Sequence, residues 1–241
     1  DDTKHLDWKL FGKLDRFFIR QYEEDTSLRA YLLLDTSGSM GCGSGRYTKV
    51  DYGRFLCAVL ACVFQQQSDA VGLVTFDCVV RRFLAPSGST RQIQRLFDHL
   101  GRVECGGETG LGTVLQNVAR RIRRRALIVL VSDLFDDSEA IVRALNHFAR
   151  RRNEVIVFQV VDREEVDFPF TGPTRFESPE TGGQLVTDAL RVRREYLRQF
   201  AAHQRTIREA CHKLRLDFRR FVTDEPLEQS IATYLAGRVR R

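Results

Sequence analysis

Four stretches of mostly apolar residues, separated by segments with helical periodicity, constrain the fold of this chain more than any other feature. The stretches lie at 29–34, 70–76, 126–131 and 155–161. A strand that is apolar on both faces needs cover on both faces, as in a parallel sheet flanked by helices. We therefore predict an α/β fold with a Rossmann-like, mostly parallel central sheet and helices on both sides.

The segments between these strands show apolar residues at three- and four-residue steps, which is typical of amphipathic helices. Residues 79–84 are expected to pair with the strand at 70–76 as a hairpin, and 217–223 to form a last strand. Ser138 is expected to cap one helix. Helices are predicted at about 49–66, 90–100, 111–123, from 138, at 188–214, and from 226 to 235.

Domain organisation follows from where this alternation stops. The Pro/Gly-rich stretch at about 163–187 breaks the pattern and predicts an insertion with a hairpin near 180–183. We predict one domain over 28–241 that carries this insertion, preceded by an N-terminal strand extension over 1–27 that packs on the core.

Three loops expected at the carboxyl ends of strands carry oxygen-bearing side chains. Loop one spans 35–40, loop two spans 106–110 and loop three spans 132–137. In an open parallel sheet, ligands bind at the carboxyl ends of the strands, so the three loops are expected to share one site. Hard cations such as Mg²⁺ prefer these oxygens. A turn stabilised by an Asx cap is the alternative for loop one alone.

The D-x-S-x-S pattern of loop one, directly after a buried strand, resembles the metal-ion-dependent adhesion site of von Willebrand factor A domains. The resemblance implies that Ser37, Ser39 and Thr109 coordinate Mg²⁺ (or Mn²⁺ or Ca²⁺) through hydroxyl groups. It also implies that Asp35 and Asp133 hold the ion directly or through water, in a solvated loop, and that a partner's carboxylate completes the coordination. The residues expected to contact the partner are Met40, Gly41, Cys42, Gly107, Glu108 and Asp136.

Further segments resemble the bacterial family called domain of unknown function 58. They are Asp-Trp-Lys at 7–9, an aromatic stretch at 17–20, an acidic pair at 23–24, and 73–77, 131–134 and 223–227. Members contain a von Willebrand factor A domain and commonly accompany MoxR-type AAA+ ATPases. The resemblance implies an adaptor or co-chaperone whose protein partner is such an ATPase or its client. The Gly-rich stretch at 41–45 departs from the family pattern.

Two other function classes remain as alternatives. Asp35 beside Mg²⁺ could accept a phosphoryl group, but the haloacid dehalogenase type of phosphatase has a second Asp two residues on, where this chain has Ser37. We therefore predict that the protein is not an enzyme. The net charge of +6 and the arginine clusters at 120–125 and 150–152 would suit an arginine-rich nucleic-acid-binding protein. Both clusters end predicted helices, where cations favour the helix dipole, so no nucleic-acid partner is expected.

Cysteine spacing and hydropathy bear on the compartment. The six cysteines show no C-x-x-C pairing, which favours a reducing bacterial cytoplasm. Every apolar run in the sequence is too short to cross a bilayer, so no membrane segment is expected among these residues. An anchor upstream of residue 1 remains an alternative. Cys42 and Cys105 are expected to be the only cysteines in loops at the metal end, within reach of each other.

Overall fold

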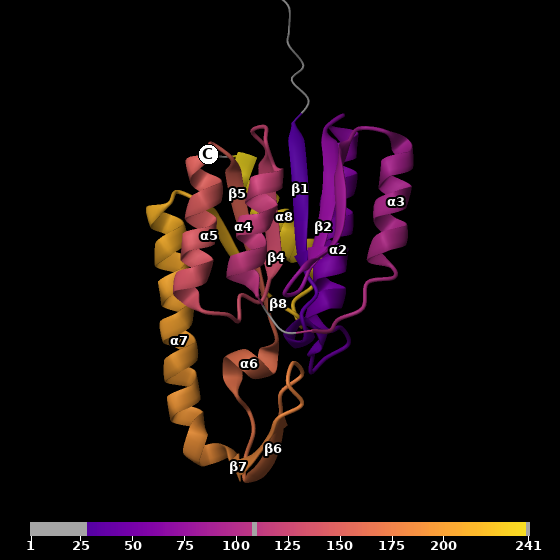
Figure 1. The fold of residues 1–241 in the computed structure, drawn as a ribbon. Coiled ribbons are helices and arrows are strands. Elements are labelled where there is room, and N and C mark those ends of the chain that lie inside the picture. The colour runs from indigo at the N-terminus through magenta and orange to yellow at the C-terminus, as the bar shows by residue number, and fades with distance from the viewer. Residues whose placement is uncertain (1–27, 108–109, 240–241) are drawn as a thin grey trace, which may run out of the picture.

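Six strands form the central sheet of the structure, a computed structural model that describes residues 28–107 and 110–239 (Figure 1). Their order is β3-β2-β1-β4-β5-β8, and all neighbours are parallel except β2 and β3, which are antiparallel. The strands are β1 (Arg29–Asp35), β2 (Ala70–Phe76), β3 (Val80–Ser87), β4 (Leu127–Ser132), β5 (Glu154–Val161) and β8 (Asp217–Val222). The predicted mostly parallel sheet is confirmed.

Helices cover both faces of this sheet, as predicted (Figure 1). The helices are α2 (Lys49–Gln66), α3 (Thr90–Leu100), α4 (Leu111–Arg121), α5 (Ser138–Arg150), α7 (Ala189–Lys213) and α8 (Leu227–Val239). The apolar run inside strand β1 faces both layers: Leu32 and Leu34 enter the core beneath α2, α3 and α8, while Tyr31 and Leu33 enter the core beneath α4, α5 and α7. The layers form the Rossmann-like α/β architecture that the sequence predicts.

The start of α2 is fixed by a capping box. Thr48 Oγ1 accepts the backbone N–H of Asp51, and the Asp51 carboxylate accepts the backbone N–H of Thr48. Because of this cap, the loop that contains the Gly-rich stretch ends at Thr48 and the helix begins at Lys49. The position of Lys49 at this helix end matters for the site described below.

The insertion lies beyond the carboxyl ends of the strands (Figure 1). It contains the short helix α6 (Arg163–Asp167) and a hairpin of β6 (Pro173–Glu177) and β7 (Gln184–Asp188). The ring of Phe168 stacks on the ring of Phe176 and packs at a tilt against the ring of Tyr196, which fixes the insertion against α7. Helix α6 was not predicted, although Asp162 and Glu165 form a capping box at its start.

The predicted strand extension over 1–27 lies outside the described residues. No described helix combines the length and apolar content that a membrane crossing needs.

Candidate metal site at the carboxyl ends of the strands

Asp35 ends β1 and is held by both neighbouring loops. Its Oδ1 accepts the backbone N–H of Ser37 at 2.9 Å, and its Oδ2 accepts the hydroxyl of Ser132 at 2.6 Å. The side chain is buried, with Asp35 only 1% exposed. The prediction that Asp35 lies in a solvated loop is therefore wrong, because the loop folds back over the strand end.

The other ligands predicted on described residues lie at the same end of the sheet. Ser37 and Ser39 flank the start of a short 3-10 turn, η2 (Gly38–Gly41), and their hydroxyl oxygens are 3.2 Å apart. Asp133 follows β4, is completely buried, and accepts the backbone N–H of Phe135 with Oδ1. Ser37, Ser39, Asp35 and Asp133 thus come from two adjacent strand ends.

Loop two is attached to loop one through the backbone. The N–H of Gly38 donates to the carbonyl of Gly107, and the N–H of Gly106 donates to the carbonyl of Thr36, both at 3.1 Å. Two predicted residues of loop two, the ligand Thr109 and the partner-contacting Glu108, lie outside the described residues. Gly106 and Gly107, the described residues that precede these two, nevertheless lie beside the D-x-S-x-S motif.

Lys49 is a site residue that sequence reasoning missed. Its side chain is fully buried, and its Nζ donates to Asp133 Oδ2 at 2.7 Å and to Glu165 Oε1 at 2.5 Å. The same Nζ lies 5.0 Å from the centre of the Phe135 ring, a cation–π contact. A lysine in the first turn of a helix opposes the helix dipole, and this was the available signal that Lys49 has a specific anionic partner.

The charges of this cluster perturb one another. Burial, and next the charge of Asp133, raise the pKa of Asp35 from 3.8 to about 7. Burial works to lower the pKa of Lys49, but the carboxylates of Asp133 and Glu165 outweigh it and raise that pKa. The cluster therefore holds the ammonium group of Lys49 beside the carboxylate of Asp133. The nearby carboxyl group of Asp35 binds a proton near neutral pH.

The raised pKa of Asp35 predicts a pH dependence of stability in EDTA. Between about pH 4 and pH 7 the folded state keeps a proton that the unfolded state has released, so the free energy of unfolding should fall as pH rises through this range. Asp35→Asn removes the titrating group and should flatten this part of the curve. Urea denaturation at a series of pH values measures both proteins, and an equal slope in the two would contradict the assignment.

The insertion packs directly on the metal motif. A Cβ added to Gly38 would lie 2.8 Å from the carbonyl oxygen of Pro179 and 3.2 Å from Cγ of Glu180. Nearby, Ser44 donates from its N–H and its hydroxyl to the carboxylate of Asp162, at 3.0 and 2.5 Å. The turn of the β6–β7 hairpin and the start of α6 therefore form one wall of the candidate site.

This close approach predicts a specific effect of Gly38→Ala. The added methyl meets backbone rather than a flexible side chain, so the hairpin must shift, and we expect a loss of about 1–3 kcal/mol in unfolding free energy. Hydrogen exchange of residues 178–183 should accelerate. Gly45→Ala is the matched control, since no atom lies within 4 Å of its added Cβ. Equal behaviour of the two variants would show that the hairpin does not rest on the motif.

The donor set agrees with a hard cation that prefers oxygen ligands. Among the described residues, no group of three or more His, Cys, Asp or Glu side chains gathers in a way that would hold an ion. The oxygens of Asp35, Ser37, Ser39 and Asp133 are carboxylates and hydroxyls, which are ligands that Mg²⁺ accepts. Two buried carboxylates that repel each other are also the arrangement that a cation relieves.

The predicted partner-contacting residues divide between surface and core. Gly41, Cys42 and Gly107 are exposed. Met40, in contrast, is fully buried against Val50 and Val103, so the prediction that it contacts a partner is wrong. The pattern could not show this, because the 3-10 turn rotates Met40 inward.

Loop three differs from its prediction in one detail. Asp136 is half-buried and accepts the N–H of Gly112, at 3.4 Å, which ties the loop to the start of α4. The helix α5 is capped by Asp137, which accepts the N–H groups of Glu139 and Ala140. The predicted cap, Ser138, is instead the first helical residue.

The cysteines at the metal end are free thiols. Cys42 is exposed and Cys105 half-buried, and a Cβ added to Gly41 would lie 3.3 Å from Cys105 Cβ, so the two loops are adjacent. Burial raises the pKa of Cys42, and that of Cys105 to about 12, which disfavours reactive thiolates. Cys78 also lies at this end, in the turn after β2, so the prediction that only two cysteines do so is wrong.

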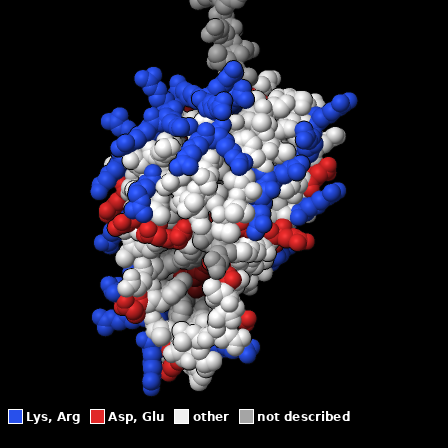
Figure 2. Space-filling model, in the orientation of Figure 1, with Lys and Arg blue, Asp and Glu red and all other residues white. Residues whose placement is uncertain are grey.

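The arginine clusters lie at the opposite end of the sheet. Figure 2 shows Lys and Arg side chains gathered where the parallel strands begin. The arginines of 120–125 and 150–152 are all exposed, and they lie in the last turns of α4 and α5 or directly after them. The molecule is thus basic at the amino end of its sheet and holds its buried carboxylates at the other end.

Comparisons with known proteins agree with this fold. An uncharacterized protein of Mycobacterium tuberculosis is 26% identical to the chain, over all of the chain and 76% of that protein, and one of Mycobacterium bovis matches equally. Among solved structures, BatB from Bacteroides thetaiotaomicron has a TM-score of 0.60 at 15% identity, covering 89% of this chain and 100% of that one. An aerotolerance-related membrane protein from Bacteroides fragilis has a TM-score of 0.55 at 16% identity, covering 86% and 96%.

The two structural neighbours, at these identities, show the fold alone. The family is shown by a sequence model described as "Protein of unknown function DUF58", which matches residues 1–206. This match spans the metal motif, loops two and three, the insertion and most of α7. The chain therefore belongs to the DUF58 family.

Proposed function

We propose that this protein is a non-catalytic, metal-dependent protein-binding module. The observation that carries the proposal is the convergence of Asp35, Ser37, Ser39 and Asp133 at one end of the sheet, between loops whose outer residues are exposed. A cation held largely by neutral hydroxyls keeps much of its positive charge. It would therefore attract a carboxylate from another protein.

The residues that would hold the ion are these four, together with Thr109 of loop two. When bound, Mg²⁺ supplies an electrophilic position for an oxygen ligand; Mn²⁺ or Ca²⁺ could take its place. The chain's own residues would do the rest. Ser132 orients Asp35. Lys49 orients Asp133 and neutralises part of its charge, so the hydroxyl groups would contribute a larger share of the coordination of the ion.

The partner in this proposal is a MoxR-type AAA+ ATPase, or the client of such an ATPase, which docks an acidic residue on the ion. Membership of the DUF58 family supports this choice, through the resemblance drawn from the sequence. The protein would act as an adaptor or co-chaperone in the bacterial cytoplasm. The exposed residues Gly41, Cys42 and Gly107 would border the docked carboxylate.

Co-purification tests the proposal. The tagged protein is co-expressed with the MoxR-type ATPase of the same genome and isolated in parallel with Mg²⁺ and with EDTA. We expect the ATPase to be retained with Mg²⁺ and lost with EDTA. Retention that is equal in both buffers would contradict metal-dependent docking, and absence of the ATPase from both would contradict the choice of partner.

A further inference from the structure

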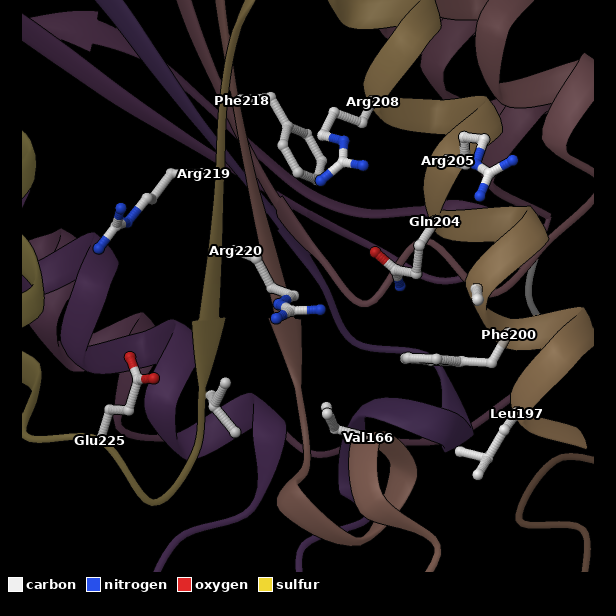
Figure 3. A pocket seen from close by; sticks show the side chains of 12 residues that line it. Val166, Leu197, Phe200, Gln204, Arg205, Arg208, Phe218, Arg219, Arg220 and Glu225 are labelled. Atoms are coloured by element: carbon white, nitrogen blue, oxygen red, sulfur yellow. The ribbon is translucent and has the colours of Figure 1, made fainter. Parts of the chain in front are cut away.

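A second candidate site lies at the edge of the sheet formed by β8. In the described chain, β8 is the outermost strand and pairs only with β5, so its other side carries unpaired backbone groups. Helix α7 runs beside it, and a cavity of about 700 Å³ separates the two (Figure 3). Neither the metal motif nor loops two and three line this cavity.

The walls of the cavity are strongly cationic. Arg205 and Arg208 come from α7 and Arg220 comes from β8. Figure 3 shows Arg208 and Arg220 directed into the space between helix and strand, with Arg205 at its border on α7. None of the three forms an ion pair with another described residue. Glu225 is the one acidic residue in the lining.

Two buried donors in the lining have no acceptor. Gln204 Nε2 and Arg219 Nε are both shielded from solvent and make no hydrogen bond to another described residue. Gln204 is directed toward β8, and Arg219 lies on the side of β8 away from α7 (Figure 3). Buried polar groups of this kind are rare, since each costs about 1–3 kcal/mol when it is left unpaired. Donors without acceptors, beside arginines without partners, indicate a ligand rich in acceptor oxygens.

The remaining surface of the cavity is apolar. Phe200 and Leu197 of α7, Phe218 of β8 and Val166 of α6 provide it. Charged residues on an edge strand also discourage association between edges, which by itself would explain Arg219 and Arg220. That role does not explain why Arg205 and Arg208, on a helix, line the same space.

We propose that this cavity binds an extended acidic peptide segment of a partner protein. The segment would add a strand along the free side of β8, while its carboxylates pair with Arg205, Arg208 and Arg220 and its apolar side chains meet Phe200 and Phe218. A peptide fits better than a small phosphate compound, because only a peptide backbone can use the unpaired groups of a strand edge. Binding here would not require the cation, so this site is separate from the proposed metal-dependent one.

Fluorescence anisotropy tests the proposal with a fluorescein-labelled hexapeptide of alternating Glu and Val, in EDTA, so that the metal site cannot contribute. We expect Arg205→Glu combined with Arg208→Glu to weaken binding by about tenfold or more, since two arginine contacts become repulsive. The matched control is Arg191→Glu with Arg194→Glu, which makes the same charge change at exposed positions of α7 outside the cavity. This control should bind like the wild type.

Three results would overturn the proposal. Equal weakening in both double variants would mean that net charge alone attracts the peptide. Undiminished binding of two hexapeptides, one N-methylated at the odd residues and the other at the even residues, would exclude strand addition. Tighter binding of a uridine oligonucleotide, lost in the Arg205/Arg208 variant, would identify a nucleic-acid site instead. Circular dichroism checks that each variant is folded.

Discussion

Lys49→Met is expected to lower the free energy of unfolding by about 3–5 kcal/mol in the absence of divalent cations. Methionine is close in length to the four-carbon stem of lysine, so the packing at the start of α2 is kept and mainly the ammonium group is lost. The change leaves Asp133, which is completely buried, and Glu165, whose side chain is 20% exposed, without their counter-charge. Removing one partner of a buried ion pair costs far more than removing one partner at the surface.

Urea denaturation with and without Mg²⁺ measures this effect. If the ion binds beside Asp133, it restores positive charge there, and Mg²⁺ should stabilise the Lys49→Met variant more than the wild type. Arg143→Met is the control, because Arg143 pairs with Asp137 and Glu139 on the surface and should lose less than about 1 kcal/mol. A Lys49 variant as stable as this control would mean that the buried cluster does not depend on the ammonium.

Asp35→Ala and Ser39→Ala are each expected to abolish the response of the protein to Mg²⁺. Binding to the folded state alone stabilises by mass action, by about 2.7 kcal/mol when the ion exceeds its dissociation constant a hundredfold. Mg²⁺ requires near-ideal octahedral geometry, so a site with few protein ligands does not tolerate the loss of one. Metal-dependent retention of the partner should disappear with the stabilisation.

The two variants differ in what they do to the metal-free protein. Asp35→Ala removes the repulsion with Asp133 but leaves the hydroxyl of Ser132 and the N–H of Ser37 without their acceptor. Ser39→Ala removes one hydroxyl contact, to Ser37, and is the cleaner variant. Thermal melting with Mg²⁺ and with EDTA checks both. A Ser39→Ala protein that still gains stability from Mg²⁺ and still binds its partner would contradict the proposed site.

Much of the fold could be predicted because buried strands and helices have recognisable sequence patterns, which are apolar runs and helical periodicity. The strand at 70–76 and the helix at 49–66 were predicted with the bounds that the structure shows, since an apolar run or an uninterrupted helical period marks each end. Helix α6 was not predicted because five residues are too few to display a helical period. Its capping box was the only local sign.

The candidate site was predictable in its motif and not in its surroundings. The oxygens of Asp35, Ser37 and Ser39 are neighbours in sequence, so their spacing alone brings them together. Lys49 reaches Asp133 and Glu165 across 84 and 116 residues, and no local pattern records such a pairing. The burial of Asp35 likewise depends on Ser132, which lies on another strand.

These long separations bear on the order in which the protein folds. Asp35 meets Ser132 across 97 residues and Ser44 meets Asp162 across 118, so both contacts close long loops of chain. Contacts of this kind carry a large entropic cost and form only after the strands between them have been arranged. We therefore expect the carboxylates of the cluster to come together late, after the transition state. A cation bound there would then slow the unfolding of the finished protein and do little to speed its folding.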